Sequence, residues 1–265
     1  MTEEKGHEQL DRIQDRFTRT AEAFSTFVLQ KRSADADRLA DMAGPKATDR
    51  MLDAACGPGT YALRFAPRVR AAVGLDYTPA MLAKARAVAD ESGLTNTSFA
   101  RGDVTSIPFR NASFNILTCG FCIHHLAKPA EAVREFARVL TRRGRLALMD
   151  LIVPEPGRPE VNNRIEIARD PSHVHTHTQP ELLRLVEGAG LRVNAAERVE
   201  SPRSFDHWMH VAGSAPGDAT YQETRRLMEA TVDDDSAGFH PRSPAVPGAD
   251  FEYTQTVLYL IAEKV

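Results

Sequence analysis

The first pattern in the chain is helical. Apolar residues recur at steps of three, four and seven near the N-terminus, the spacing that places side chains on one face of a helix: Leu10, Ile13, Phe17 and Phe24. We expect one helix over residues 8–43, ended by Gly44-Pro45, because glycine and proline disfavour its continuation. Residues 1–45 are interpreted as an N-terminal helical cover.

Beyond this helix, short apolar runs alternate with helical patterns. Strands are expected at residues 50–55, 71–76, 97–101, 113–119, 145–153, 191–199 and 254–263. Helices are expected between them at residues 61–66, 79–91, 129–140 and 181–187. Strands separated by helices predict an α/β fold with a doubly wound, mostly parallel, seven-stranded sheet.

Two segments interrupt this alternation. Residues 154–180 are rich in proline and histidine, and we interpret them as a lid inserted into a core of residues 46–200. Residues 201–250 hold one helical stretch among many turn residues, which indicates a partly helical cap that contributes to the substrate site. Residues 251–265 are expected to return to the core as its terminal strand.

Composition narrows the classes of protein. The 265 residues are 42% hydrophobic and carry a formal net charge of −3, so no overall basic field attracts nucleic acid. No apolar run reaches the roughly 20 residues that span a bilayer, and the N-terminus is polar where a signal peptide is apolar. Three cysteines form an odd set, which indicates no disulfide framework and favours the cytoplasm.

A glycine loop follows the first expected strand. Gly57 and Gly59 allow the backbone to approach a ligand closely, and the next helix offers free N–H groups at its start. Asp76 ends the second strand, where a carboxylate accepts hydrogen bonds from ribose hydroxyls. This much also fits an NAD-binding loop. Asp53 before the glycines and Asp103 after the third strand favour an S-adenosylmethionine site.

The order of these motifs carries a family resemblance. LDAACGPG, GLD, RGDVTSIPF, FNILTCGFCIHHL and EFARVLTRRGRLALMD follow one another. The chain resembles the class I S-adenosylmethionine-dependent methyltransferases, in the ubiquinone/menaquinone C-methyltransferase-like (methyltransferase type 11) branch. The resemblance covers roughly residues 10–200 and the terminal strand, and residues 201–250 match only loosely. It implies a Rossmann-like methyltransferase fold.

The resemblance also implies a set of cofactor-binding residues. Gly57 and Gly59 would contact the methionine end, with Asp53 fixing the loop and the amino group. Asp76 would hold the ribose, and Asp103 would accept from the adenine amino group. The other implied cofactor contacts are Ala55, Pro58, Tyr77, Met81, Val104, Cys119 and Phe121. Ala55 stands where the family often has glycine, and Arg142-Arg143-Gly144 where it has Pro-Gly-Gly.

The residues at the end of the fourth expected strand indicate the class of methyl acceptor. Its end reads Cys119-Gly120-Phe121-Cys122, without the Asn/Asp/Ser-Pro-Pro-aromatic turn that is typical of methylation of nucleic acid bases. We therefore expect a small, cyclic or apolar acceptor methylated at carbon, oxygen or nitrogen, with S-adenosylhomocysteine as product. A non-catalytic cofactor-binding protein and an NAD-dependent oxidoreductase are the alternatives. Whether the chain forms a homodimer stays open.

Histidines supply the candidate catalytic groups. His124 is interpreted either as a base that touches the acceptor or as a buried structural histidine, whereas the structural role is favoured for His125. His173, His175 and His177 alternate, so we expect all three rings on one face of an extended segment.

The repeat of about 7 Å along such a segment suits a small metal ion poorly. The three histidines are therefore interpreted either as part of a polar lid, in which His173 faces the acceptor, or as part of a solvated loop. Because no oxygen-rich ligand set stands at the end of the fourth strand, we expect a metal-independent enzyme. Arg169 and Asp170 are expected to fix this lid through a salt bridge. The run His207-Trp208-Met209-His210 is interpreted as a packing turn in preference to an aromatic wall of the pocket.

Overall fold

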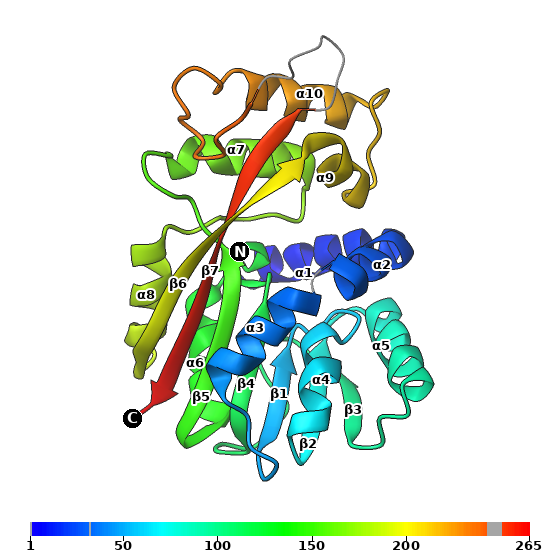
Figure 1. Ribbon diagram of the computed structural model, residues 1–265, viewed down its shortest axis with the longest axis vertical. Helices are drawn as coiled ribbons and strands as arrows, with labels where there is room; N and C mark the ends of the chain where they lie inside the picture. Colours follow the sequence, from blue (N-terminus) through cyan, green and yellow to red (C-terminus); the bar gives the residue numbers. More distant parts are fainter. Residues whose placement is uncertain (1, 32, 243–250) are drawn as a thin grey trace.

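The computed structural model describes residues 2–31, 33–242 and 251–265. Its centre is a seven-stranded sheet in the order β3-β2-β1-β4-β5-β7-β6 (Figure 1). β1 to β5 pair in parallel, and β7 runs antiparallel to both β5 and β6. The strands are β1 (Arg50–Ala54), β2 (Ala71–Asp76), β3 (Thr97–Arg101), β4 (Phe114–Gly120), β5 (Leu140–Leu151), β6 (Leu191–Ser204) and β7 (Glu252–Lys264). The predicted mostly parallel, seven-stranded sheet is confirmed.

Helices cover both faces of this sheet, as predicted. The core helices are α3 (Ser33–Ala43), α4 (Thr60–Phe65), α5 (Pro79–Glu91), α6 (Pro129–Val139) and α8 (Gln179–Gly188). Side chains alternate along a strand, so Met51 packs with α3 and α4 on one face, while Leu52 packs with α6 and α8 on the other. The core therefore consists of two apolar layers with the sheet between them.

The topology creates a crevice at one edge of the sheet. The chain order reverses between β1 and β4, which are parallel neighbours. In open α/β sheets, ligands bind at such a switch point beyond the carboxyl ends of the strands. The glycine loop after β1 and the short 3-10 helix η2 (Ile123–His125) after β4 both lie at this edge.

A long ribbon connects the core to the cap. β6 and β7 stay paired from Leu191↔Lys264 to Ser204↔Glu252, and Figure 1 shows the ribbon rising from the sheet to the cap helices. The cap holds α7 (Pro159–Arg169), α9 (Phe205–Val211) and α10 (Ala219–Glu229). Its own apolar cluster includes Phe205, Trp208 and Tyr253. The cap thus has a core separate from the two layers of the sheet.

Several expected boundaries were wrong in this region. The packing turn expected at residues 207–210 is part of helix α9, which Ser204 caps by accepting a hydrogen bond from the His207 N–H at 3.0 Å. The segment 154–180 contains the unexpected helix α7, and β6 continues beyond residue 199 to Ser204. The expected helical stretch in the cap is confirmed as α10. Residues 243–250 of the expected cap lie outside the described residues.

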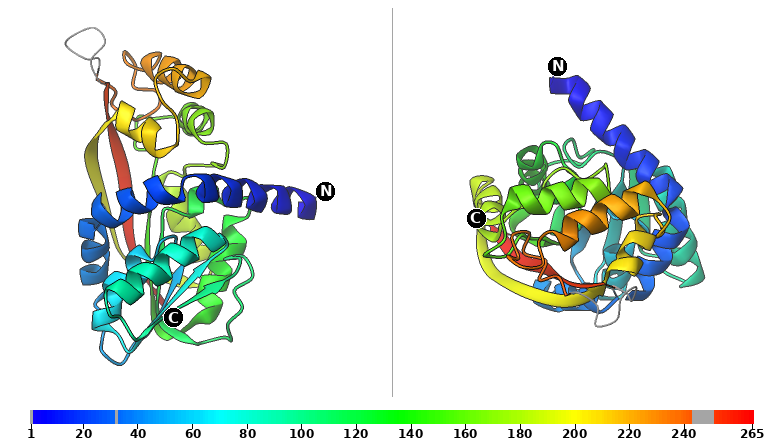
Figure 2. Two further views of the ribbon diagram at one scale, coloured as in Figure 1. Left: turned by 90° about the vertical axis from the view of Figure 1, so that its right-hand side faces the viewer. Right: turned by 90° about the horizontal axis from the view of Figure 1, so that it is seen from above.

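The N-terminal cover is also more complex than expected. Three helices replace the single one: α1 (Thr2–Arg19), α2 (Ala21–Lys31) and α3. Figure 2 shows α1 crossing between the cap and the sheet, whereas α3 packs on the core. The chain bends because these helices cover different surfaces. No helix among the described residues is long and apolar enough to cross a membrane.

Candidate active site

A cavity lies between the carboxyl edge of the sheet and the cap. Its walls come from α1, the glycine loop, the ends of β2 and β3, η2, the lid segment, α9 and the β6–β7 ribbon. Most of the predicted site residues line it: Ala55, Gly57, Pro58, Asp76, Tyr77, Met81, Asp103, Val104, Phe121, His124 and His173. Asp53, Gly59 and Cys119 are not among the described residues of its wall.

Asp53 is fully buried behind the glycine loop. Its carboxylate accepts hydrogen bonds from the Ala62 N–H at 2.9 Å and from the Thr118 hydroxyl at 2.8 Å. Burial raises the pKa of Asp53 to about 7, although these donors favour the charged form. Asp53 therefore ties β1 to the start of α4 and to β4, which holds the loop in place from behind.

The loop itself depends on left-handed backbone conformations. Ala55, Gly57 and Gly59 have φ of 57°, 52° and 88°. A Cβ on Gly57 would meet no described heavy atom within 4 Å, so this backbone borders open space. A Cβ on Gly59 would lie 3.1 Å from the Ala85 Cβ, so Gly59 permits packing against α5. The two glycines thus have different roles.

Two strand-end carboxylates line the cavity near this loop. Asp76 accepts hydrogen bonds from the Gly57 N–H at 2.7 Å and from the Thr78 N–H at 2.8 Å. Burial raises the pKa of Asp76. Asp103 accepts from the N–H and the hydroxyl of Thr105, at 2.8 and 2.7 Å. Both carboxylates are therefore oriented by donors from the neighbouring loops, and both face the cavity.

A buried histidine–carboxylate pair lies on the same cavity. His124 Nδ1 is 2.5 Å from Asp150 Oδ1, at the end of β5. Burial by itself lowers the pKa of His124. The negative charge of Asp150 and its hydrogen bond have a larger, opposite effect, so the net pKa of His124 is raised. Sequence reasoning missed Asp150, although it is a strand-end acid like Asp76. The pair orients the His124 ring with Nδ1 toward the acid.

The two neighbouring histidines are held neutral. Burial lowers the pKa of His125 to about 4, and its Nδ1 lies 3.0 Å from the Ser172 carbonyl oxygen. Burial also lowers the pKa of His173, whose Nε2 lies 2.8 Å from Asn163 Oδ1. The His173 ring stacks on His124 with centroids 5.4 Å apart. Among these three rings, His124 alone has a raised pKa.

Helix α1 closes one side of the cavity and is tied to the lid. Gln9 donates from Nε2 to the carbonyl oxygens of His125 at 2.9 Å and Ser172 at 2.7 Å. Arg16 and Asp170 form a buried salt bridge at 3.0 Å, with 7% and 5% of their side chains exposed. The lid therefore has a salt bridge, as expected, but the partner of Asp170 is Arg16 of α1. Arg169 pairs instead with Glu166, at 3.3 Å.

The cap supplies the wall opposite the sheet. Trp208 lines the cavity and packs against Tyr253, with ring centroids 4.9 Å apart. The Arg169 guanidinium lies 4.5 Å from the centroid of the Trp208 ring. Trp208 therefore packs in the cap cluster, as expected, and also forms part of the cavity wall, which was the less favoured interpretation. Sequence reasoning also missed Arg203 and Gln255 of the ribbon, which no local motif marks.

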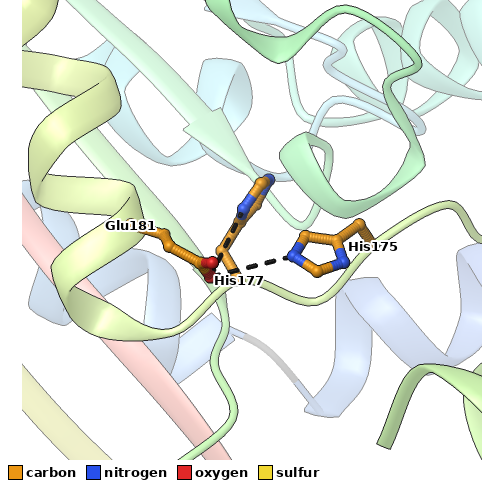
Figure 3. Close-up of side chains that lie close together, drawn as sticks. All are labelled: His175, His177 and Glu181. Atoms are coloured by element: carbon orange, nitrogen blue, oxygen red, sulfur yellow. Dashed lines mark ion pairs between the residues drawn. The ribbon is translucent and has the colours of Figure 1, made fainter. Parts of the chain in front are cut away.

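The alternating histidines do not share one face. His173 points to the cavity, whereas His175 and His177 lie beside Glu181 of α8 in a separate hollow (Figure 3). The segment is extended but irregular, so the strict alternation of a strand does not apply. The expectation of three rings on one face was wrong.

Comparison with known proteins agrees with the fold and indicates the family. Residues 52–148 match the family model described as a methyltransferase domain. The chain is 33% identical over 216 residues to the uncharacterized methyltransferase YcgJ of Bacillus subtilis, which covers 81% of this chain and 85% of that protein. The crystal structure of YcgJ superposes with a TM-score of 0.81 at 29% identity, and covers 87% of this chain and 98% of that one.

A second relative agrees with the branch indicated by the sequence. The ubiquinone/menaquinone biosynthesis C-methyltransferase UbiE of Dinoroseobacter shibae is 36% identical over 126 residues, or 46% of this chain and 50% of that protein. The fold and these relatives define an S-adenosylmethionine-dependent methyltransferase. The chain belongs to the methyltransferase family that includes YcgJ.

Proposed function

We propose that the enzyme transfers a methyl group from S-adenosylmethionine to carbon, oxygen or nitrogen of a small, cyclic or apolar acceptor. The observation that carries this proposal is that one cavity is lined both by Asp76 and Asp103 and by His124. Cofactor and acceptor can therefore lie next to each other, which methyl transfer requires.

The cofactor end of the cavity fits S-adenosylmethionine. Gly57 borders open space, and a side chain there would fill it. Asp76 and Asp103 offer carboxylate lone pairs to the ribose hydroxyls and to the adenine amino group. Asp53 and Gly59 act from behind the wall by fixing the loop. When bound, the cofactor supplies an electrophilic methyl group.

The acceptor end fits a hydroxyl or enol whose proton must leave. Asp150 holds Nδ1 of His124, so Nε2 is the nitrogen that accepts this proton as the acceptor oxygen or carbon bonds to the methyl group. His173 and Trp208 bound the same space. The buried pairs Arg16–Asp170 and Arg169–Glu166 neutralise the charges around it. Arg203 of the ribbon also lines the cavity, and its buried Nε has no hydrogen-bond partner among the described residues, so this end combines aromatic and apolar walls with one further cationic group.

Calorimetry and a transfer assay test the proposal. We expect S-adenosylhomocysteine to bind with micromolar affinity, about −8 kcal/mol, and more tightly than NAD. Labelled methyl groups should then pass from S-adenosylmethionine to members of a panel of electron-rich phenols and enols. Tighter NAD binding would contradict the cofactor assignment. Tight S-adenosylhomocysteine binding without transfer to any acceptor would favour a non-catalytic protein.

A further inference from the structure

Three metal-ligating side chains converge outside the cavity. His175 Nε2 and His177 Nδ1 lie 3.7 and 3.9 Å from Glu181 Oε2. One ligand atom from each residue falls within 4.8 Å of the others. Figure 3 shows both imidazoles beside the carboxylate at the start of α8. All three side chains are partly exposed, so an ion can reach them from solvent.

Backbone contacts hold these side chains in position. The Val153 N–H donates to the His177 carbonyl oxygen at 3.0 Å, and the His175 N–H donates to the His124 carbonyl oxygen at 3.0 Å. Glu181 belongs to a capping box, in which its Oε2 accepts from the Thr178 N–H at 2.7 Å. The convergence therefore does not depend on attraction among the three groups alone, which means that the site is preorganised.

We propose that His175, His177 and Glu181 bind a divalent transition-metal ion, with zinc as the preferred ion. Two imidazole nitrogens and one carboxylate oxygen are ligands that zinc takes, with a fourth position left for water. Bonds of about 2.0–2.1 Å in a tetrahedron hold ligand atoms roughly 3.3–3.4 Å apart. The histidine–carboxylate distances are a few tenths of an ångström wider, and the two imidazole nitrogens lie within 4.8 Å of each other, so a rotation that brings the two rings together closes the site around an ion.

Two neighbouring groups limit the affinity. Metal binding at His175 Nε2 moves the ring proton to Nδ1, which lies 3.1 Å from the side-chain Nδ2 of Asn163. Two donors would then face each other, where a metal-bound histidine usually donates to an acceptor. The exposed Arg184 side chain also lines the hollow and adds positive charge. We therefore expect micromolar affinity.

The ion would act on the lid and would take no part in the transfer. It would fasten residues 175–177 to the first turn of α8, on the side of the chain away from the cavity. His173, two residues earlier, lines the cavity. A bound ion would thus stabilise the segment that carries His173. Its binding can be measured without any methyl transfer, so this proposal and the proposed function fail independently.

Titration of the full-length, chelator-treated protein with zinc tests the site. We expect one ion per chain with micromolar affinity, a rise in Tm on the order of 5 °C at saturation, and visible absorption from cobalt bound in its place. Magnesium, which prefers oxygen ligands in an octahedron, should give no comparable signal. Absence of saturable zinc binding would overturn the proposal.

Variants separate this site from other histidines. Glu181→Gln keeps the capping box, because glutamine also serves at that position, but removes the carboxylate. We expect Glu181→Gln and His175→Gln each to weaken zinc binding at least tenfold, with His210→Gln on α9 as the unaffected control. Wild-type affinity in both Glu181→Gln and His175→Gln would overturn the assignment.

Discussion

The two ends of the cavity are built from different kinds of sequence. The end that we assign to the cofactor comes mainly from one stretch, residues 55–104, which includes the segments that follow β1, β2 and β3. The acceptor end is assembled from α1, η2, the lid, α9 and the β6–β7 ribbon, which lie far apart in the chain. The first end is fixed by short-range contacts to the sheet, such as the hydrogen bond from the Gly57 N–H to Asp76. The acceptor end is held by pairwise contacts between α1, the lid and the cap, so it is the end that substitutions can open.

The largest effect is expected from breaking the link between α1 and the lid. Arg16→Met leaves Asp170 as a buried charge without its partner, a change that costs about 3–5 kcal/mol in buried ion pairs. We expect α1 and residues 154–180 to lose hydrogen-exchange protection, while the sheet keeps its protection. Hydrogen exchange followed by mass spectrometry measures this.

The double variant Arg16→Met/Asp170→Asn supplies the control for that prediction. Because it removes the orphaned charge as well, it should recover part of the lost protection. Unchanged exchange in Arg16→Met would show that the salt bridge does not hold the two covers together.

A second prediction concerns chemistry at the acceptor end. His124→Gln removes the proposed base, and such a loss costs about 100-fold or more in rate. We expect kcat/KM to fall by this factor, while the affinity for S-adenosylhomocysteine changes less than twofold. A normal rate would return His124 to a structural role.

The pH dependence of kcat/KM tests the same role of His124 as a base. The base must be neutral to accept a proton, and the net effect of Asp150 raises the pKa of His124 above its ordinary value near 6.5. kcat/KM should therefore be low at acidic pH and rise through this raised pKa to a plateau. Asp150→Asn removes the charge that raises the pKa, so the midpoint should move to lower pH. A profile that is flat across this range would argue against a histidine base.

The third prediction targets the cofactor end. Asp76→Ala removes the acceptor of the Gly57 and Thr78 N–H groups, and with it the hydrogen bonds that the carboxylate would make to the ribose, each worth about 1.5–3 kcal/mol. We expect at least tenfold weaker S-adenosylhomocysteine binding by calorimetry, with an unchanged circular dichroism spectrum. Asp90→Ala, on the exposed face of α5, is the matched control. Equal affinity in Asp76→Ala would show that the ribose contact is misassigned.

The smallest effect is expected at Ala55. Its φ of 57° is left-handed, a conformation that costs a residue with a Cβ about 1–2 kcal/mol. Glycine avoids this strain but is more flexible when unfolded. Ala55→Gly should therefore raise the free energy of unfolding by up to about 1 kcal/mol, with cofactor affinity retained. A loss of stability on urea denaturation would mean that the alanine methyl packs favourably.

How well each helix and strand could be predicted from the sequence depends on whether its buried positions recur at a fixed spacing. Periodic apolar patterns predicted the sheet, because a strand or helix buried on a core must repeat. These patterns failed where the buried positions have no period, as in α9, which packs most of its short length into the cap. They also failed at the end of β6, because Pro202 is unusual in a strand, although Pro202 pairs with Thr254 at the sheet edge. The bend between α1 and α3 was also missed, because both carry the same period.

The candidate site divides in the same way. Asp76 and Asp103 could be identified because a strand-end acid after a glycine loop is a local signal. Asp150 carries a similar signal but was overlooked. The Arg16–Asp170 pair and the place of Arg203 depend on how remote segments meet, which one sequence does not reveal. Cys119 is fully buried in β4 and packs in the core, where an apolar strand would place it.

The position of β7 has a consequence for the order in which the protein forms. β7 lies between β5 and β6 in the sheet, yet it is translated after both. On the ribosome, β5 and β6 each lack their antiparallel partner while α9 and α10 are being made. The ribbon, and with it the cap wall that Tyr253 completes, can form only when residues 252–264 have emerged. The acceptor end is therefore the last part of the enzyme to assemble, and until then the β5 edge is open to pairing with other chains.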